Sequence, residues 1–119
     1  MSGEADLIAL LASAPALIAL GADKVFLNAA DEGTVTPYVV VTATHDFDKL
    51  LTGDTDIDHI SYTIAAWGAS SLQAEAIADA IIVAVETDDR GVEFLSRTGG
   101  FDQDTAMDVA VLSADEWAQ

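Results

Sequence analysis

Two β-rich stretches decide the fold of this chain: YVVVTATH at residues 38–45 and IDHISYTIAAW at residues 57–67. Both are rich in β-branched side chains, and the second alternates two sets of side chains, which is typical of a strand with one buried face. We expect them to form a central antiparallel hairpin in which Val40 pairs with Ile64, because this register keeps the apolar side chains of both strands on one face.

The other elements follow from periodicity and turn residues on either side of this hairpin. Apolar residues recur at helical spacing in residues 4–14, and Pro15 ends that helix or starts a second short turn that Gly21 stops. We predict strands at 25–28, 92–98 and 105–112, a helix at 71–87, and connections at 46–56, 88–91 and 99–102. The order α-β-β-β-α-β-β indicates an α+β fold with a mainly antiparallel sheet packed against helices, and we expect residues 1–119 to form one domain.

The helix predicted at residues 71–87 has clear start and core signals. Ser70 and Gln73 have the spacing of a capping box. Residues at three- and four-residue spacing predict a core stripe of Ala74, Ile77, Ala78, Ile81 and Val85.

The same helix carries an acidic arc between apolar side chains. On a helical wheel the arc consists of Glu75, Asp79 and Glu86. Leu72 and Val83 flank it on one side and Ile82 flanks it on the other. These apolar residues either reach over the sheet or face a neighbouring subunit. The candidate subunit-interface residues are therefore Leu72, Asp79, Ile82 and Val83.

Charge and composition exclude several classes of function. The chain has 21 Asp and Glu against 4 Lys and Arg, a formal net charge of -17, and its basic residues are scattered. Binding to nucleic acid or to an anionic membrane needs clustered cations. The absence of cysteine excludes disulfides, thiolate catalysis and cysteine-based zinc sites. The apolar stretch at residues 7–20 is too short to span a bilayer, and we expect a soluble protein made in the cytoplasm.

A possible calcium site begins at Asp54, Asp56 and Asp58, whose alternate spacing resembles the start of a calcium loop. The sixth position, which should be glycine, is His59, and the twelfth, which should be glutamate, is Ala65. We therefore interpret this stretch as a solvated acidic loop.

A second possible metal site uses His45 and His59, which the predicted register places opposite each other, with Asp46 and Asp58 beside them. Two histidines on neighbouring strands more often have a structural role. We also find no Gly-x-Ser-x-Gly nucleophile elbow and no phosphate-binding loop. The sequence predicts no catalytic residue, no cofactor and no metal, and it favours packing roles for Trp67 and Trp117.

Several strings resemble a known family: LIALGADKVF at 17–26, TPYVVV at 36–41, and YTIAAW at 62–67, followed by a helix near residue 71. The chain resembles the tail completion or tail terminator proteins of long-tailed bacteriophages and gene transfer agents over residues 7–112. The family has no catalytic motif, so the resemblance carries none over to this chain.

The resemblance implies a structural, non-enzymatic virion protein at the head-proximal end of the tail. Copies of the chain would form a ring, expected to be hexameric, that caps the tail tube, ends its polymerisation and provides the head-tail joining surface. The implied partners are other copies of the chain, the tail tube protein and a head-tail connector protein, with DNA passing through the lumen without specific binding. The loop at 46–56 and the acidic N-terminal region are candidates for the axial contacts.

Two other functions remain open on the residues alone. The chain could be an acidic adaptor module that binds a basic protein, or a small metal-dependent enzyme that uses His45 and His59. The acidity itself has two explanations, a lumen that repels DNA and adaptation to a saline habitat or to solubility.

Overall fold

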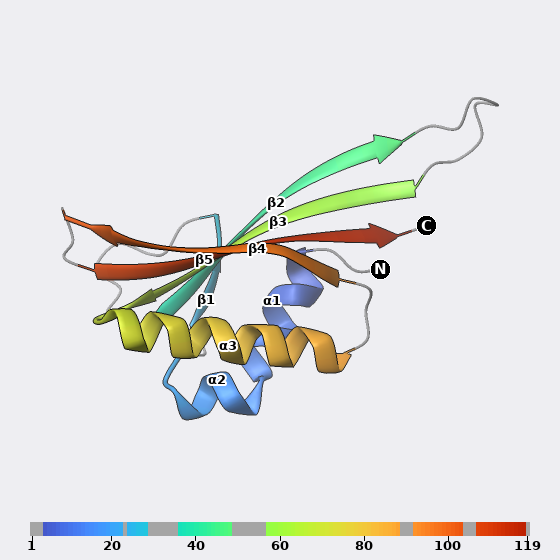
Figure 1. The fold of residues 1–119 in the computed structure, drawn as a ribbon. Coiled ribbons are helices and arrows are strands. Elements are labelled where there is room, and N and C mark those ends of the chain that lie inside the picture. Colours follow the sequence, from blue (N-terminus) through green and yellow to red (C-terminus); the bar gives the residue numbers. More distant parts are fainter. Residues whose placement is uncertain are drawn as a thin grey trace.

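The computed structural model describes residues 4–22, 24–28, 36–48, 57–88, 92–103 and 107–118. Its elements are α1 (Glu4–Ser13), α2 (Pro15–Ala19), β1 (Val25–Leu27), β2 (Tyr38–Asp48), β3 (Ile57–Gly68), α3 (Ser71–Asp88), β4 (Val92–Asp102) and β5 (Met107–Ala118). The strands form one sheet in the order β1-β2-β3-β5-β4; β1 pairs with β2 in parallel and the other described neighbours pair antiparallel. The described helices lie on one side of this sheet (Figure 1). The predicted fold class, element order and mainly antiparallel pairing are confirmed.

Pro15 breaks the N-terminal helical region in two, as the sequence predicts. It lies in the first turn of α2, where a missing N–H group leaves no hydrogen bond unmade. At the other end Gly21 has a φ of 74°, a conformation that favours glycine. The N–H groups of Gly21 and Ala22 donate to the carbonyl oxygens of Ile18 and Leu17 at 3.0 and 2.8 Å. This Schellman pattern ends the helix and turns the chain toward β1.

The predicted capping box forms at the start of α3, with one difference. The N–H of Gln73 donates to Ser70 Oγ at 3.2 Å, whereas Gln73 Oε1 accepts from the N–H of Ala69 at 2.7 Å, one residue before the expected partner. Gly68, at the end of β3, lies very close to α3: a Cβ added there would lie 2.9 Å from the backbone nitrogen of Ala74. The close approach of β3 to α3 therefore requires glycine.

The hydrophobic core lies between the helices and the sheet. The predicted core stripe of α3 is buried throughout: Ala74, Ile77, Ala78, Ile81 and Val85. It packs with buried strand residues that include Val39, Val41, Ile60, Tyr62, Ile64, Ala66, Ala110, Leu112 and Ala114. One buried carboxylate enters this layer, and Tyr62 Oη donates a hydrogen bond to Glu116 Oε1 at 2.6 Å. The hydrogen bond offsets the cost of burying these polar groups.

The register of β2 against β3 differs by one residue from the prediction. Val41, rather than Val40, lies opposite Ile64. Opposite residues of an antiparallel pair point to the same face, so Val41 joins the core and Val40 points to the other side. The prediction was wrong because YVVV at residues 38–41 is a continuous apolar run, in which alternation does not mark the buried residues.

Strands β2, β4 and β5 extend beyond their predicted ends, to Asp48, Asp102 and Ala118. Residues 46–48 and 99–102, predicted as connections, therefore pair with neighbouring strands. Their polar and glycine-rich sequences have low strand propensity, but tertiary pairing overrides so weak a preference. The remainder of these connections, at 49–56 and 89–91, lies outside the described residues.

An aromatic cluster lies on the side of the sheet away from the helices. Tyr38 stacks on Trp67 with ring centroids 6.3 Å apart, and Phe26 meets Tyr38 edge-on at 6.1 Å. Tyr38 Oη lies 4.0 Å from Met107 Sδ. Trp67 is thus a packing residue, as predicted, whereas the side chain of Trp117 lies outside the described residues.

Candidate subunit interface

The predicted interface residues all lie on α3 but have different surroundings. Leu72 and Val83 are exposed, with relative accessibilities of 83% and 58%. Ile82 is partly buried and packs against the core. Asp79 is exposed and forms an ion pair with Arg97. Leu72 and Val83 are therefore the two that offer apolar area to a partner.

Arg97 of β4 bridges the acidic arc of α3. Its Nη1 donates to Asp79 Oδ1 at 2.7 Å, and its Nη2 donates to the Glu75 carbonyl oxygen at 3.2 Å and to the Glu75 carboxylate. The hydrogen bond to Asp79, followed by that to Glu75, holds the pKa of the Arg97 guanidinium above its ordinary value. The positive charge of Arg97 therefore neutralises part of the negative charge of the acidic arc.

A β-bulge brings Arg97 to the helix side of the sheet. The register of β4 against β5 shifts between Phe94 and Ser96, which leaves Leu95 as the extra residue. Beyond the bulge Arg97 lies opposite Leu112, a core residue. Uninterrupted alternation from Phe94 would have placed Arg97 on the opposite side. This contact was not predicted from the sequence, in which the available signal is a lone arginine in a strand that follows an acidic helix.

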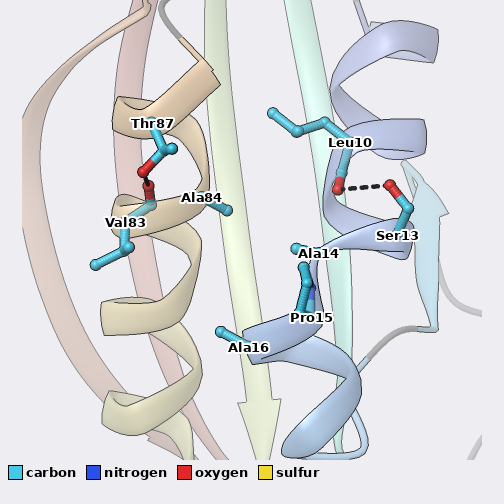
Figure 2. Close-up of a pocket in the computed structure, with 8 residues that line it drawn as sticks. All are labelled: Leu10, Ser13, Ala14, Pro15, Ala16, Val83, Ala84 and Thr87. Carbon is cyan, nitrogen blue, oxygen red and sulfur yellow. Dashed lines mark hydrogen bonds between the residues drawn. The ribbon is translucent and has the colours of Figure 1, made fainter.

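An apolar groove of about 450 Å³ runs between α3 and the α1–α2 bend. Figure 2 shows the side chains from the two sides around this groove. Among the described residues, no charged side chain lines the groove; its lining is Leu10, Ser13, Ala14, Pro15, Ala16, Val83, Ala84 and Thr87. Val83, a predicted interface residue, is therefore part of a concave surface that sequence periodicity did not reveal.

The two hydroxyl groups in this lining bond to their own helices. Thr87 Oγ1 donates to the Val83 carbonyl oxygen at 2.7 Å, and Ser13 Oγ donates to the carbonyl oxygens of Ala9 and Leu10 at 2.9 and 3.3 Å (Figure 2). Because each hydroxyl proton is already directed to a helix carbonyl, the groove suits an apolar occupant more than a polar one.

A second cleft of about 300 Å³ lies where the start of α3 meets the end of β4. Its lining includes Ser71 and Glu75 of α3 and Phe101 of β4. Phe101 has a relative accessibility of 58%. Leu72 belongs to the same first turn of α3 as Ser71, so this end of the molecule carries two large exposed apolar side chains.

Residues 5–117 match the family described as tail completion protein gp17. The chain belongs to this family. It is therefore a structural protein of a phage tail, located in the virion tail, and the resemblance stated from the sequence is confirmed.

The fold of this tail protein also occurs in a solved virion structure. A chain in a structure described as the virion of a native gene transfer agent (GTA) particle aligns with a TM-score of 0.74 and 19% identity. The alignment covers 93% of the present chain and 90% of the other. None of the curated proteins matches the chain.

The histidines of this family member do not face each other. The register places His45 opposite Ile60 and Asp46 opposite His59, so the predicted pairing of the two histidines is wrong by the same single residue as the hairpin. His59 Nε2 lies 3.2 Å from Asp115 Oδ1, which also accepts a hydrogen bond from Ser61 Oγ at 3.2 Å.

The two candidate metal sites fall largely on residues whose side chains lie outside the described part of the structure, His45, Asp46 and Asp58 among them. Among the described residues no group of three or more His, Asp or Glu side chains is placed to hold a metal ion. Asp54 and Asp56 of the calcium-like stretch lie outside the described residues. No described helix is long and apolar enough to cross a membrane.

Proposed function

We propose that copies of this chain form a ring, expected to be hexameric, that caps the head-proximal end of the tail tube. The ring ends polymerisation of the tube and provides the surface to which the head joins. Membership in the tail completion family supports a role at this stage of assembly. The observation that carries the proposal is the apolar surface around Val83. On a chain of net charge -17, an exposed apolar surface of this kind marks a site of contact with another subunit.

The proposed contact between neighbouring subunits uses one face of α3 and the residues Leu72, Asp79, Ile82 and Val83. Leu72 and Val83 supply apolar area because both are exposed. Ile82 is partly buried and packs against the hydrophobic core, so it anchors this face of α3. Asp79 is bridged by Arg97, which reduces the repulsion between neighbouring acidic subunits.

The axial partners in this proposal are the tail tube protein on one side and the head-tail connector protein on the other. DNA passes through the lumen without specific binding, because 21 acidic residues against 4 basic ones repel phosphate groups. We propose the segment 46–56 and the acidic N-terminal region for the axial contacts. Residues 46–48 of that segment belong to β2 and pair with β3.

Deletion of the gene tests the role in tail termination. We expect particles without the protein to have tails of uncontrolled length or tails that fail to join heads, measured by electron microscopy and by infectivity or transfer. Tails of normal length joined to heads in the deletion strain would overturn the proposed function.

Val83→Glu tests the interface within this function. The side chain is exposed, so the fold should persist with a change in unfolding free energy of about 0.5 kcal/mol or less. The added charge should prevent ring assembly and reproduce the deletion phenotype. Two controls should assemble normally: Val83→Thr, which keeps the shape without the charge, and Thr98→Glu, which adds the charge at an exposed position of β4. Normal tails in the folded Val83→Glu variant would exclude this face of α3 from the interface.

A further inference from the structure

The chain carries an apolar groove beside Val83 and, at another place, the exposed apolar side chains Leu72 and Phe101. The groove is concave, apolar and about 450 Å³ in volume, and it lies on the flank of α3 that faces α1 and α2. Leu72 and Phe101 lie at the end where α3 begins and β4 ends. One aromatic side chain buries about 150–250 Å² when it enters such a groove. The chain therefore carries both a receiving and a projecting apolar surface, at separate places.

Electrostatics favour another copy of this chain as the occupant. Two chains of net charge -17 can meet only where few carboxylates are brought together. None of the described residues that line the groove is charged. On the projecting side, Arg97 bridges both Glu75 and Asp79, and Asp108 lines the same cleft as Phe101, so these three carboxylates and one guanidinium leave two net negative charges. Repulsion in the contact is limited because these charges meet a groove whose described lining carries no charge.

We propose that Phe101 and Leu72 of one copy insert into the groove formed by Ala14, Ala16, Val83 and Ala84 of the next copy. The inference rests on the proposed ring and assigns its contact to two different surfaces. Because the surfaces differ, the contact is head-to-tail: each copy uses its groove toward one neighbour and its projection toward the other. Repetition of such a contact closes into a ring when the rotation permits, whereas a contact between two identical patches ends at a dimer.

Disulfide crosslinking tests this assignment, because the natural chain has no cysteine. Ala16→Cys places a thiol in the groove and Phe101→Cys places one on the projection. We expect each single variant to remain uncrosslinked after mild oxidation of assembled particles. An equimolar mixture of the two should give covalent dimers and nothing longer, because each chain has one thiol. The double variant should give a ladder of oligomers that ends at the closed ring.

The matched control combines Ala16→Cys with Leu27→Cys, since Leu27 is also exposed but lies on β1. This pair should give no ladder.

Two outcomes would overturn the proposal. The first is dimers from either single variant alone, which would indicate contact between identical patches. The second is absence of the ladder from the double variant, and if the tails of those particles end normally, the proposed function stands without this contact. Normal tails after gene deletion would remove the function itself, whatever the crosslinks show.

Discussion

The two flanks of α3 differ in how they meet the rest of the molecule. On the β4 side, Arg97 closes the gap by bridging Glu75 and Asp79. On the side of α1 and α2, the helix leaves an open groove lined by apolar and small residues, with Val83 at its edge. One flank is closed by ionic hydrogen bonds and the other is left free for a contact.

This difference shows why a helical wheel was an incomplete guide to the interface. The wheel treats the acidic arc and its apolar neighbours as one surface exposed to the same solvent. In the structure a cation from another element neutralises part of the arc, and a separate helix pair turns the area near Val83 into a concavity. Whether an exposed side chain can serve in assembly therefore depends on the elements that pack beside it.

Breaking the core beneath both flanks should have the largest effect. Val41 is fully buried and lies opposite Ile64, so Val41→Asp should cost about 3–5 kcal/mol of unfolding free energy by burying a carboxylate without a partner. Both flanks would be lost together, because α3 packs on this layer. Chemical denaturation monitored by far-ultraviolet circular dichroism measures the loss.

The matched control for this prediction is Val40→Asp, one residue away on the other side of the sheet. We expect a smaller loss of about 1–2 kcal/mol, since Val40 is only partly buried. Equal losses, or a larger loss at Val40, would contradict the register of the hairpin.

Removing the ionic bridge should have a moderate effect confined to the β4 flank. Arg97→Met keeps much of the aliphatic stem and should lower the unfolding free energy by about 1 kcal/mol at low salt. The difference from the natural chain should shrink at about 1 M salt, where screening is strong. Glu86→Gln, which removes the acidic residue of the arc that does not contact Arg97, should change stability by about 0.5 kcal/mol or less. A difference that is insensitive to salt would contradict an ionic origin of the stabilisation.

The pKa of Arg97 gives this bridge a definite dependence on pH. A cation whose pKa is raised on folding contributes stability that is complete below its unfolded pKa, which for arginine lies far above neutral pH, and is lost only as pH rises through the higher folded pKa. Titration of Arg97 therefore contributes no change between neutral pH and about pH 9. We expect the stability difference between Arg97→Met and the natural chain to stay constant over that range in parallel denaturation experiments. A difference that falls as pH rises in this range would contradict the assignment of the stability difference to a permanently charged Arg97.

Filling the groove should have the smallest effect on stability and a large effect on assembly. Ala16→Leu adds apolar volume to the groove lining at an exposed position of α2, so the unfolding free energy should change by about 0.5 kcal/mol or less. Ring assembly, measured by tail length and by recovery of capped tails, should decrease because the space for the neighbouring side chain is occupied. Ala19→Leu makes the same substitution in α2 outside the groove and should assemble normally. Normal assembly of Ala16→Leu would count against the groove as a contact.

Much of the local structure could be predicted because local signals agree there. The stripe from Ala74 to Val85 identified the buried face of α3, and Pro15 and Gly21 marked the limits of α2, as the burial and cap geometry confirm. The family was also recognised from short strings, which the match over residues 5–117 confirms. The candidate interface residues stay a prediction, and the structure reports only their surroundings: Leu72 and Val83 are exposed, whereas Ile82 packs against the core. Phe101 was predicted to lie in a connection but belongs to β4.

The sequence by itself determined the element order, the core stripe of α3, the acidic character and the family, because each depends on residue type and spacing within one segment. The tertiary structure decided the hairpin register, the lengths of the strands, the side on which Arg97 lies and the existence of the groove. A continuous apolar run fits either register until helices cover one face, and a bulge at Leu95 is defined only against the partner strand. The groove is the space between α3 and the α1–α2 bend, so it exists only once segments about seventy residues apart are packed together.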